Sequence, residues 1–224
     1  MAAKVVAVAN LKGGVGKSHL VTSLSAAAQA TGIATAVLDI DADQQFSARW
    51  SDRREAETPL VISPVYSRLP QAIAELDSRG LELILIDCAA KTIHETERAV
   101  EVSDFVLIPT RASLGDLQYV EATINITTAK DKPRAVILNF VERTRETGEA
   151  LAYLEHLGVA VMPVHLSKAV AFNRAAAAAL GVTEYEPGSK SAQEIRDVLE
   201  WISGLLELSL GKGASNEAQR LNAA

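Results

Sequence analysis

The sequence has a single cysteine, few aromatic residues and no long apolar run. Cys88 alone excludes an internal disulfide and an all-cysteine metal site within one chain, so we expect it to be a small buried residue without chemistry. The longest apolar stretches, such as residues 83–86, are too short to cross a bilayer, and no signal-peptide pattern opens the chain. These absences predict a cytoplasmic protein whose core is built from Val, Ile, Leu and Ala.

The charge balance is acidic rather than basic. A formal net charge of -6 does not indicate a nucleic-acid-binding protein. A local basic patch can still act within a Debye length, whatever the total charge. Composition therefore leaves the partner open.

Short β-branched runs alternate with Ala- and Leu-rich stretches along the chain. The pattern predicts strands at residues 4–10, 34–40, 60–63, 83–87, 105–109, 134–139 and 159–162. It predicts helices at residues 17–30, 69–78, 95–102, 114–130, 148–157, 169–180 and 191–210. Glycines that follow helical stretches are expected as C-terminal caps: Gly32, Gly80, Gly158 and Gly181.

The predicted strands are apolar without clean alternation, which is typical of strands covered on both faces. Together with the alternation of strands and helices, this predicts an α/β fold with a doubly wound, mostly parallel sheet and helices on both faces. No internal repeat or long linker is present, so we expect one domain at residues 1–210. The small, polar segment 211–224 is expected to be a flexible tail.

The segment from Lys12 to Ser18 follows the first predicted strand and precedes the first predicted helix. This context is required of a phosphate-binding loop. Its glycines let backbone N–H groups converge on an anion, and the helix N-terminus adds partial positive charge. Lys17 is placed to reach the β- and γ-phosphates of ATP, and the Ser18 hydroxyl can coordinate Mg²⁺. The alternative is a plain glycine turn with two solvated lysines.

The same segment resembles the deviant Walker A motif of the ParA/MinD family of P-loop ATPases, which is marked by the lysine at position 12. The resemblance implies slow ATP hydrolysis by a homodimer. It also implies that Lys12 reaches the nucleotide of the other subunit. A cation supplied in trans makes dimerisation depend on phosphate charge. His19 departs from the family, where a second threonine is usual.

Acidic residues follow two predicted strands. Residues 39–45 are similar to the family's D-x-D-x-Q segment, and residues 83–87 resemble a Walker B strand. The resemblance implies a catalytic set of Lys12, Lys17 and Asp41, with Asp41 orienting or activating the attacking water. It implies metal-supporting roles for Ser18, Asp39 and Asp87, although Asp39 could instead support the loop. The alternative is that acidic residues end strands because the chain emerges there into water.

Residues 137–139 resemble the family strand whose asparagine faces adenine. A terminal amide can donate to and accept from a base edge at once, although a strand-end turn residue is the alternative. Ser47, Trp50 and Arg54 also fit the plasmid-type branch of ParA. The expected nucleotide contacts are Gly13, Gly14, Val15, Gly16, Lys17, Ser18, His19 and Asn139.

Family members differ in the surface on which the ATP-bound dimer sits. Residues 205–212 contain one acid, one base and a glycine, which makes a poor membrane anchor. A lone cysteine disfavours the iron-carrying relatives. ParA-like members bind DNA non-specifically through basic residues near the C-terminal helices, and here these are Lys168, Arg174, Lys190 and Arg196. The alternative for these four residues is an ordinary solvated face.

The leading hypothesis is therefore a ParA-like ATPase that positions a plasmid, a chromosome region or a protein assembly on the nucleoid. No arginine finger is evident, so a ParB-like or other adaptor protein is expected to accelerate hydrolysis. One alternative is a MinD-like, membrane-associated positioning ATPase. Another is an ATP-dependent metabolic ligase on the same fold, but such an enzyme needs a second catalytic constellation, and the sequence shows none.

Overall fold

The computed structural model describes residues 2–90, 92–142 and 145–209. The predicted tail at residues 211–224 lies outside the described residues and stays a prediction, as does the assignment of residues 1–210 to one domain. The predicted helix at residues 191–210 is too long, because the helix ends at Leu206 and Glu207 takes the left-handed conformation with φ 58°.

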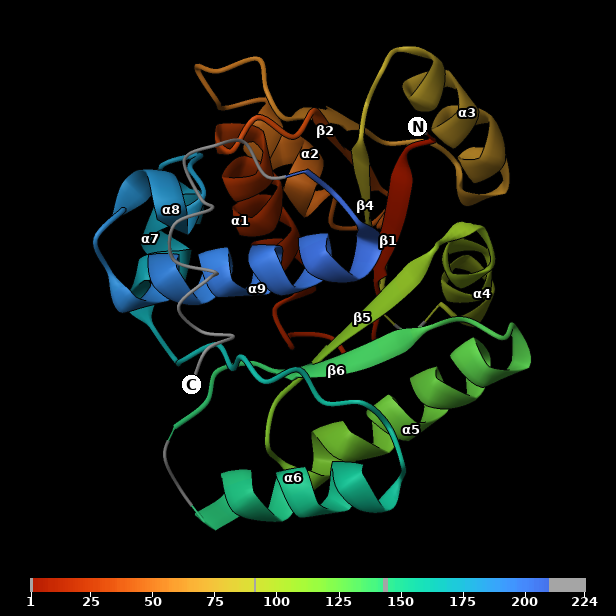
Figure 1. Ribbon diagram of the computed structural model, residues 1–224, viewed down its shortest axis with the longest axis vertical. Coiled ribbons are helices and arrows are strands. Elements are labelled where there is room, and N and C mark those ends of the chain that lie inside the picture. Colours follow the sequence, from red (N-terminus) through yellow and green to blue (C-terminus); the bar gives the residue numbers. More distant parts are fainter. Residues whose placement is uncertain (1, 91, 143–144, 210–224) are drawn as a thin grey trace.

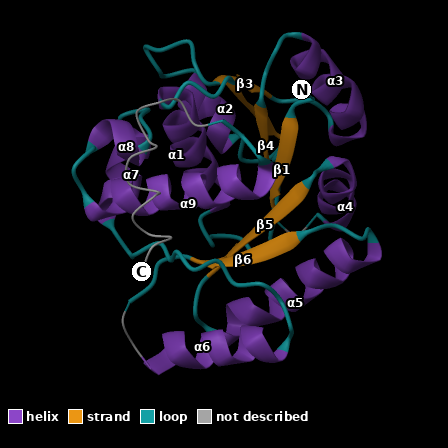
Figure 2. Ribbon diagram, viewed as in Figure 1, coloured by secondary structure: helices purple, strands orange, loops and turns teal. Residues whose placement is uncertain are grey.

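The described chain is organised around one parallel sheet (Figures 1 and 2). Its strands lie in the order β3-β2-β4-β1-β5-β6, and every neighbouring pair is parallel. In chain order they are β1 (Lys4–Val8), β2 (Thr35–Asp39), β3 (Leu60–Ile62), β4 (Leu83–Asp87), β5 (Phe105–Thr110) and β6 (Arg134–Leu138). The predicted doubly wound fold is confirmed.

Helices cover both faces of this sheet (Figure 1). They are α1 (Lys17–Ala30), α2 (Phe46–Ser51), α3 (Leu69–Ser78), α4 (Ile93–Val102), α5 (Leu114–Ala129), α6 (Arg145–His156), α7 (Val170–Ala177), α8 (Val182–Tyr185) and α9 (Lys190–Leu206), with a 3-10 turn at Tyr66–Arg68. Successive strand residues point to opposite faces. Val6 and Val8 accordingly pack in one core with α1 and α9, and Val5 and Ala7 pack in the other with α3 to α6.

The predicted strand at residues 159–162 is wrong. This segment forms only an isolated bridge to β6, from Val161 to Val136, and a second bridge joins Ser167 to Val141. Pro163 follows the segment directly, and the next hydrogen bond to β6 comes only from the N–H of Leu166, which donates to Leu138, so no continuous ladder forms. The segment nevertheless runs along β6 and covers that edge of the sheet.

The cap prediction holds at Gly32, Gly80 and Gly158, which adopt positive φ angles of 90°, 82° and 63°. It is wrong at Gly181, whose φ of -76° is ordinary. Helix α7 ends earlier than predicted, and Ala179 takes the left-handed conformation with φ 57°. Gly181 instead begins α8, where a Cβ would clash with Ala26 of α1.

Two short helices, α2 and α8, were not predicted. Both are shorter than the stretch over which a helical period can be recognised. Trp50 on α2 is fully buried, and its indole N–H donates to the carbonyl of Leu180 at 3.2 Å. Tertiary packing therefore holds α2 in place. Among the described residues, no helix is both long and apolar enough to cross a membrane.

Candidate functional site

The phosphate loop joins β1 to α1 at the carboxyl edge of the sheet. Gly14 and Gly16 adopt positive φ angles of 76° and 90°, which favour glycine. A Cβ on Gly16 would also clash with the side chains of Asn139 and Phe140. The loop is therefore shaped by local backbone requirements as well as by packing, and it opens onto the free N–H groups of the first turn of α1.

Lys17 lies inside this loop with only 7% of its surface exposed. Its ammonium donates to the carbonyl of Lys12 at 3.2 Å. Burial lowers the pKa of Lys17, and the nearby Asp87 carboxylate partly offsets that effect. The side chain lines a cavity of about 420 Å³ together with the glycines of the loop. A buried cation in a glycine cradle fits the polyphosphate of a nucleotide.

Asp87 is the buried carboxylate at the end of β4. It accepts hydrogen bonds from the hydroxyls of Ser47 at 2.7 Å and Ser18 at 3.2 Å. Burial raises the pKa of Asp87 to about 7, and the neighbouring Asp39 carboxylate adds to the effect. The hydroxyl of Ser18 and the carboxylate of Asp87 lie side by side and are both hard oxygen ligands. Their chemistry therefore fits a Mg²⁺ site.

Asp39 is also buried, but its oxygens are used differently. One accepts from the backbone N–H of Ala48 at 3.0 Å, and the other from the N–H of Asp41 at 3.1 Å. Burial raises the pKa of Asp39, and these backbone hydrogen bonds oppose that shift. Of the two roles expected for Asp39, the contacts favour support of the loop over direct metal ligation.

Asp41 lies at the mouth of the loop and is half-buried. One of its oxygens accepts from the N–H of Gln44 at 2.9 Å. The residue lines both the 420 Å³ cavity and an adjoining cavity of about 300 Å³ beside Gly13 and Ala90. This position is open to a water molecule next to the phosphate loop, as the predicted catalytic role requires.

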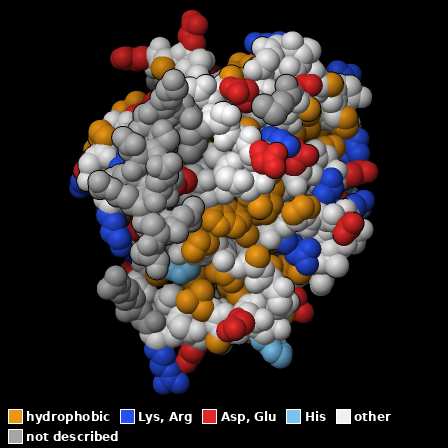
Figure 3. Space-filling view, in the orientation of Figure 1, with side chains coloured by type: hydrophobic (Ala, Val, Ile, Leu, Met, Phe, Trp, Pro, Cys, Tyr) orange, Lys and Arg blue, Asp and Glu red, His pale blue; other side chains and the backbone are white. Residues whose placement is uncertain are grey.

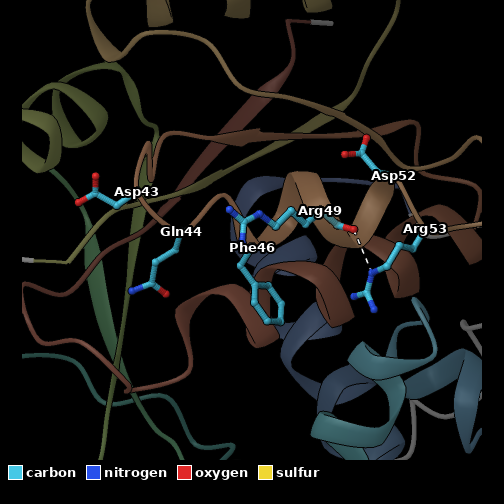
Figure 4. A pocket seen from close by; sticks show the side chains of 6 residues that line it. All are labelled: Asp43, Gln44, Phe46, Arg49, Asp52 and Arg53. Carbon is cyan, nitrogen blue, oxygen red and sulfur yellow. Dashed lines mark hydrogen bonds between the residues drawn. The ribbon is translucent and has the colours of Figure 1, made fainter.

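A further cavity of about 650 Å³ lies over α2 (Figure 4). Gln44 and Phe46 line both this cavity and the phosphate-loop cavity. The ring of Phe46 lies 4.8 Å from that of His19, and the side chain of Asn173 also lies beside the imidazole. Burial lowers the pKa of His19, which keeps the imidazole neutral near pH 7. His19 therefore stands in the cavity wall, between α2 and α7.

Lys12 is held away from the cavity by α5. Its ammonium lies 3.9 Å from a carboxylate oxygen of Asp116 and 5.1 Å from the centre of the Tyr119 ring. The side chain keeps 39% exposure, whereas that of Asp116 keeps 10%. The backbone of Lys12 is fixed by Asn10, whose side chain also donates to the carbonyl of Pro109 at 2.9 Å. Lys12 is thus a partly exposed cation on a well-anchored loop.

Asn139 is buried at the end of β6. Its amide donates to the carbonyl of Val15 at 2.8 Å, and its oxygen accepts from the N–H of Phe140 at 2.8 Å. The side chain therefore ties β6 to the phosphate loop, a role that the sequence did not predict. Contact with adenine would require added or exchanged hydrogen bonds, and this role stays a prediction.

The four basic residues predicted to bind DNA do not form one free patch in the described chain. Lys168 pairs with Glu142 at 2.8 Å, and Lys190 pairs with Glu194 at 3.3 Å. Arg196 donates to Gln193 and to the carbonyl of Pro187. Arg174 is exposed in the last turn of α7. On the face in Figure 3, basic and acidic side chains are interspersed.

Sequence reasoning missed Arg111, the first residue after β5. It lines the phosphate-loop cavity and hydrogen-bonds the carbonyl of Gly14. Its position directly after a buried strand was the available signal, because ligands bind at the carboxyl ends of such strands.

Comparison with known proteins agrees with this geometry. Residues 6–182 match the family described as the CobQ/CobB/MinD/ParA nucleotide binding domain. The chain is 28% identical over 207 residues to the maintenance of carboxysome distribution protein A of Halothiobacillus neapolitanus, covering 87% of this chain and 94% of the relative.

Solved structures share the fold. The septum site-determining protein MinD of Pyrococcus horikoshii, complexed with Mg-ADP, has a TM-score of 0.73 at 17% identity, covering 91% of this chain and 97% of that one. An ATP complex of McdA from Cyanothece has a TM-score of 0.71 at 12% identity, covering 93% and 98%. At these identities the likeness extends to the fold alone.

Proposed function

Since this chain belongs to the CobQ/CobB/MinD/ParA nucleotide-binding family, we propose that it is a ParA-like ATPase that positions cargo on DNA. Two copies close around ATP, and the closed dimer binds DNA without sequence preference. Hydrolysis, accelerated by an adaptor protein, releases the dimer. The protein acts in the cytoplasm, on the nucleoid.

The placement of Lys12 is the observation that carries this proposal. Lys17 is buried inside its own loop, whereas the side chain of Lys12 is 39% exposed at the rim, where a second subunit could reach it. Its contact to Asp116, at 3.9 Å and partly solvated, is weak enough to exchange for a phosphate. A phosphate of the nucleotide bound by a second subunit would be a stronger partner for Lys12 than Asp116 is.

The contacts support the following roles within one subunit. Lys17 and the loop N–H groups hold the polyphosphate, while Ser18 and Asp87 hold Mg²⁺. Bound Mg²⁺ supplies electrostatic stabilisation to the phosphate oxygens. Asp41 orients the attacking water from the loop that follows β2. Asp39 fixes that loop through its two backbone hydrogen bonds.

The cargo that the comparisons favour is a protein assembly. The relative from Halothiobacillus neapolitanus is named for carboxysome distribution and matches most of both chains. We propose that this chain likewise positions a large protein body rather than a plasmid. DNA serves as the track, contacted through Arg174 together with Lys168, Lys190 and Arg196.

Retention on random-sequence DNA with and without ATP tests the proposal. We expect retention only with ATP, falling steeply as salt rises. Arg174→Ala should weaken retention, whereas Arg79→Ala, which removes one charge at the end of α3, should not. ATP-dependent binding to anionic liposomes with none to DNA would contradict the proposal and favour a MinD-like protein.

A further inference from the structure

Arg111 stands on the rim of the phosphate-loop cavity. It follows β5, which pairs with β1 on one side and β6 on the other. Its side chain therefore emerges between the phosphate loop and the end of β6. One guanidinium nitrogen donates to the carbonyl of Gly14, and the guanidinium lies 4.7 Å from the centre of the Phe140 ring. Both neighbours belong to the nucleotide site.

Phe140, the residue on which Arg111 stacks, is itself held in place. Phe140 adopts a φ of 56°, a conformation that non-glycine residues rarely take. Its N–H is held by the Asn139 side chain, and its ring packs next to Gly16. Stacking on this ring limits the directions in which the guanidinium can turn. Phe140 thus holds Arg111 beside the phosphate loop, although the backbone of Phe140 itself adopts an unfavourable left-handed conformation.

The charge of Arg111 lacks an acidic partner in the part of the chain that the structure describes. Lys12, Arg54 and Lys168 each have a carboxylate within ion-pair distance, whereas Arg111 has a neutral carbonyl. A guanidinium has more N–H donors than this one bond uses. A phosphate oxygen is a stronger acceptor than a carbonyl for a charged donor.

Arg111 also separates two cavities. It lines the 420 Å³ cavity with the loop glycines, Lys17 and Ser18, and it lines an adjoining cavity of about 640 Å³ with Phe140 and Asn173. A nucleotide with its phosphates in the first cavity would therefore lie beside this guanidinium.

From this geometry we propose that Arg111 binds the nucleotide, and that its guanidinium donates hydrogen bonds to phosphate oxygens while it stacks on the Phe140 ring. The inference rests on the nucleotide site of the proposed function but not on DNA binding or dimerisation. Arg111 adds a third cation, supplied in cis, to the two lysines of the loop.

Equilibrium binding of a fluorescent ATP analogue with Mg²⁺, at low protein concentration, tests the assignment. Arg111→Ala should weaken binding roughly tenfold, the loss typical of one charge-assisted hydrogen bond at an exposed rim. Arg111→Gln should bind as weakly as Arg111→Ala, because it can restore the bond to Gly14 but not the charge. Arg79→Ala controls for the change in net charge. Lys17→Ala gives the affinity that remains when the phosphate site is lost.

Three results would overturn the assignment. Wild-type affinity in Arg111→Gln would mean that the residue only braces the loop. Tighter binding by Arg111→Ala would mean that it blocks the site, and unchanged binding by both variants would mean that it contacts no phosphate. If the wild type itself bound no nucleotide, the proposed function would fail as well.

Discussion

At the scale of single residues, the two carboxylates after β2 have separable tasks. Asp39 is buried and saturated by backbone N–H groups, so it shapes the loop. Asp41 lines two cavities, and within the described chain only one of its carboxylate oxygens accepts a hydrogen bond, from the N–H of Gln44. This difference favours Asp41 over Asp39 for the water-activating role that we propose.

We expect Asp41→Ala to retain ATP binding while its turnover falls at least about 100-fold, as loss of a general base usually causes. Single-turnover hydrolysis measures the effect. Asp43→Ala, on the same loop and exposed, is the matched control and should turn over normally. Normal hydrolysis by Asp41→Ala would remove this residue from the mechanism.

The residues of the phosphate loop were predictable because they are contiguous and their chemistry is local. Asp39 and Asp87 were predictable because both end buried strands of a parallel sheet. Arg111 carried the same positional signal, directly after a buried strand, but its contact with the phosphate loop depends on β5 lying next to β1. The bracing role of Asn139 likewise depends on packing against Gly16. Contacts between distant segments were the part that the sequence did not reveal.

At the scale of elements, α2 and α8 are joined by a charged clasp that sequence periodicity does not show. Arg54 stacks on Trp50 at 4.4 Å and donates to both carboxylate oxygens of Glu184, at 2.8 and 2.9 Å. Its side chain is only 3% exposed. Helix α2 follows the Asp41 loop, so this clasp holds the element to which that loop connects.

Arg54→Ala removes both the stacking and the bidentate ion pair. We expect a loss of about 2–3 kcal/mol of unfolding free energy, since a half-buried carboxylate is left without its partner. Denaturant unfolding measures the change. Arg53→Ala, on the preceding residue and without an ion pair among the described residues, should cost less than half as much. Equal losses in the two variants would refute the clasp.

The same clasp predicts a pH dependence. Burial alone would raise the pKa of Glu184, but hydrogen bonds from Arg54 and from the N–H of Gly181 hold it below the ordinary value of 4.5. The unfolded chain therefore takes up the proton first as pH falls. The contribution of Glu184 is fully present above pH 4.5 and is lost as pH falls through the lower folded-state pKa.

Glu184→Gln removes this ionisation. The difference in unfolding free energy between wild type and Glu184→Gln should be constant from about pH 6 upward and should shrink below pH 4.5. Urea unfolding at several pH values gives the comparison. A difference that grows as pH falls would contradict the assignment.

At the scale of the whole molecule, the sheet order brings the functional segments to one edge. β1 lies between β4 and β5, so the phosphate loop, Asp87 and Arg111 emerge side by side. Lys12 lies at the outer rim of this edge, where α5 holds it through Asp116 and Tyr119. We predict that ATP draws Lys12 from this contact into a second subunit.

The most direct test is the mass in solution of Asp41→Ala with and without Lys12→Ala. Light scattering after size-exclusion chromatography, with ATP and Mg²⁺, gives the oligomeric state. We predict an ATP-dependent dimer for Asp41→Ala and a monomer for the double variant, with ATP binding retained in both. A double variant that still dimerises with ATP would contradict the central claim that Lys12 makes the nucleotide a bridge between subunits.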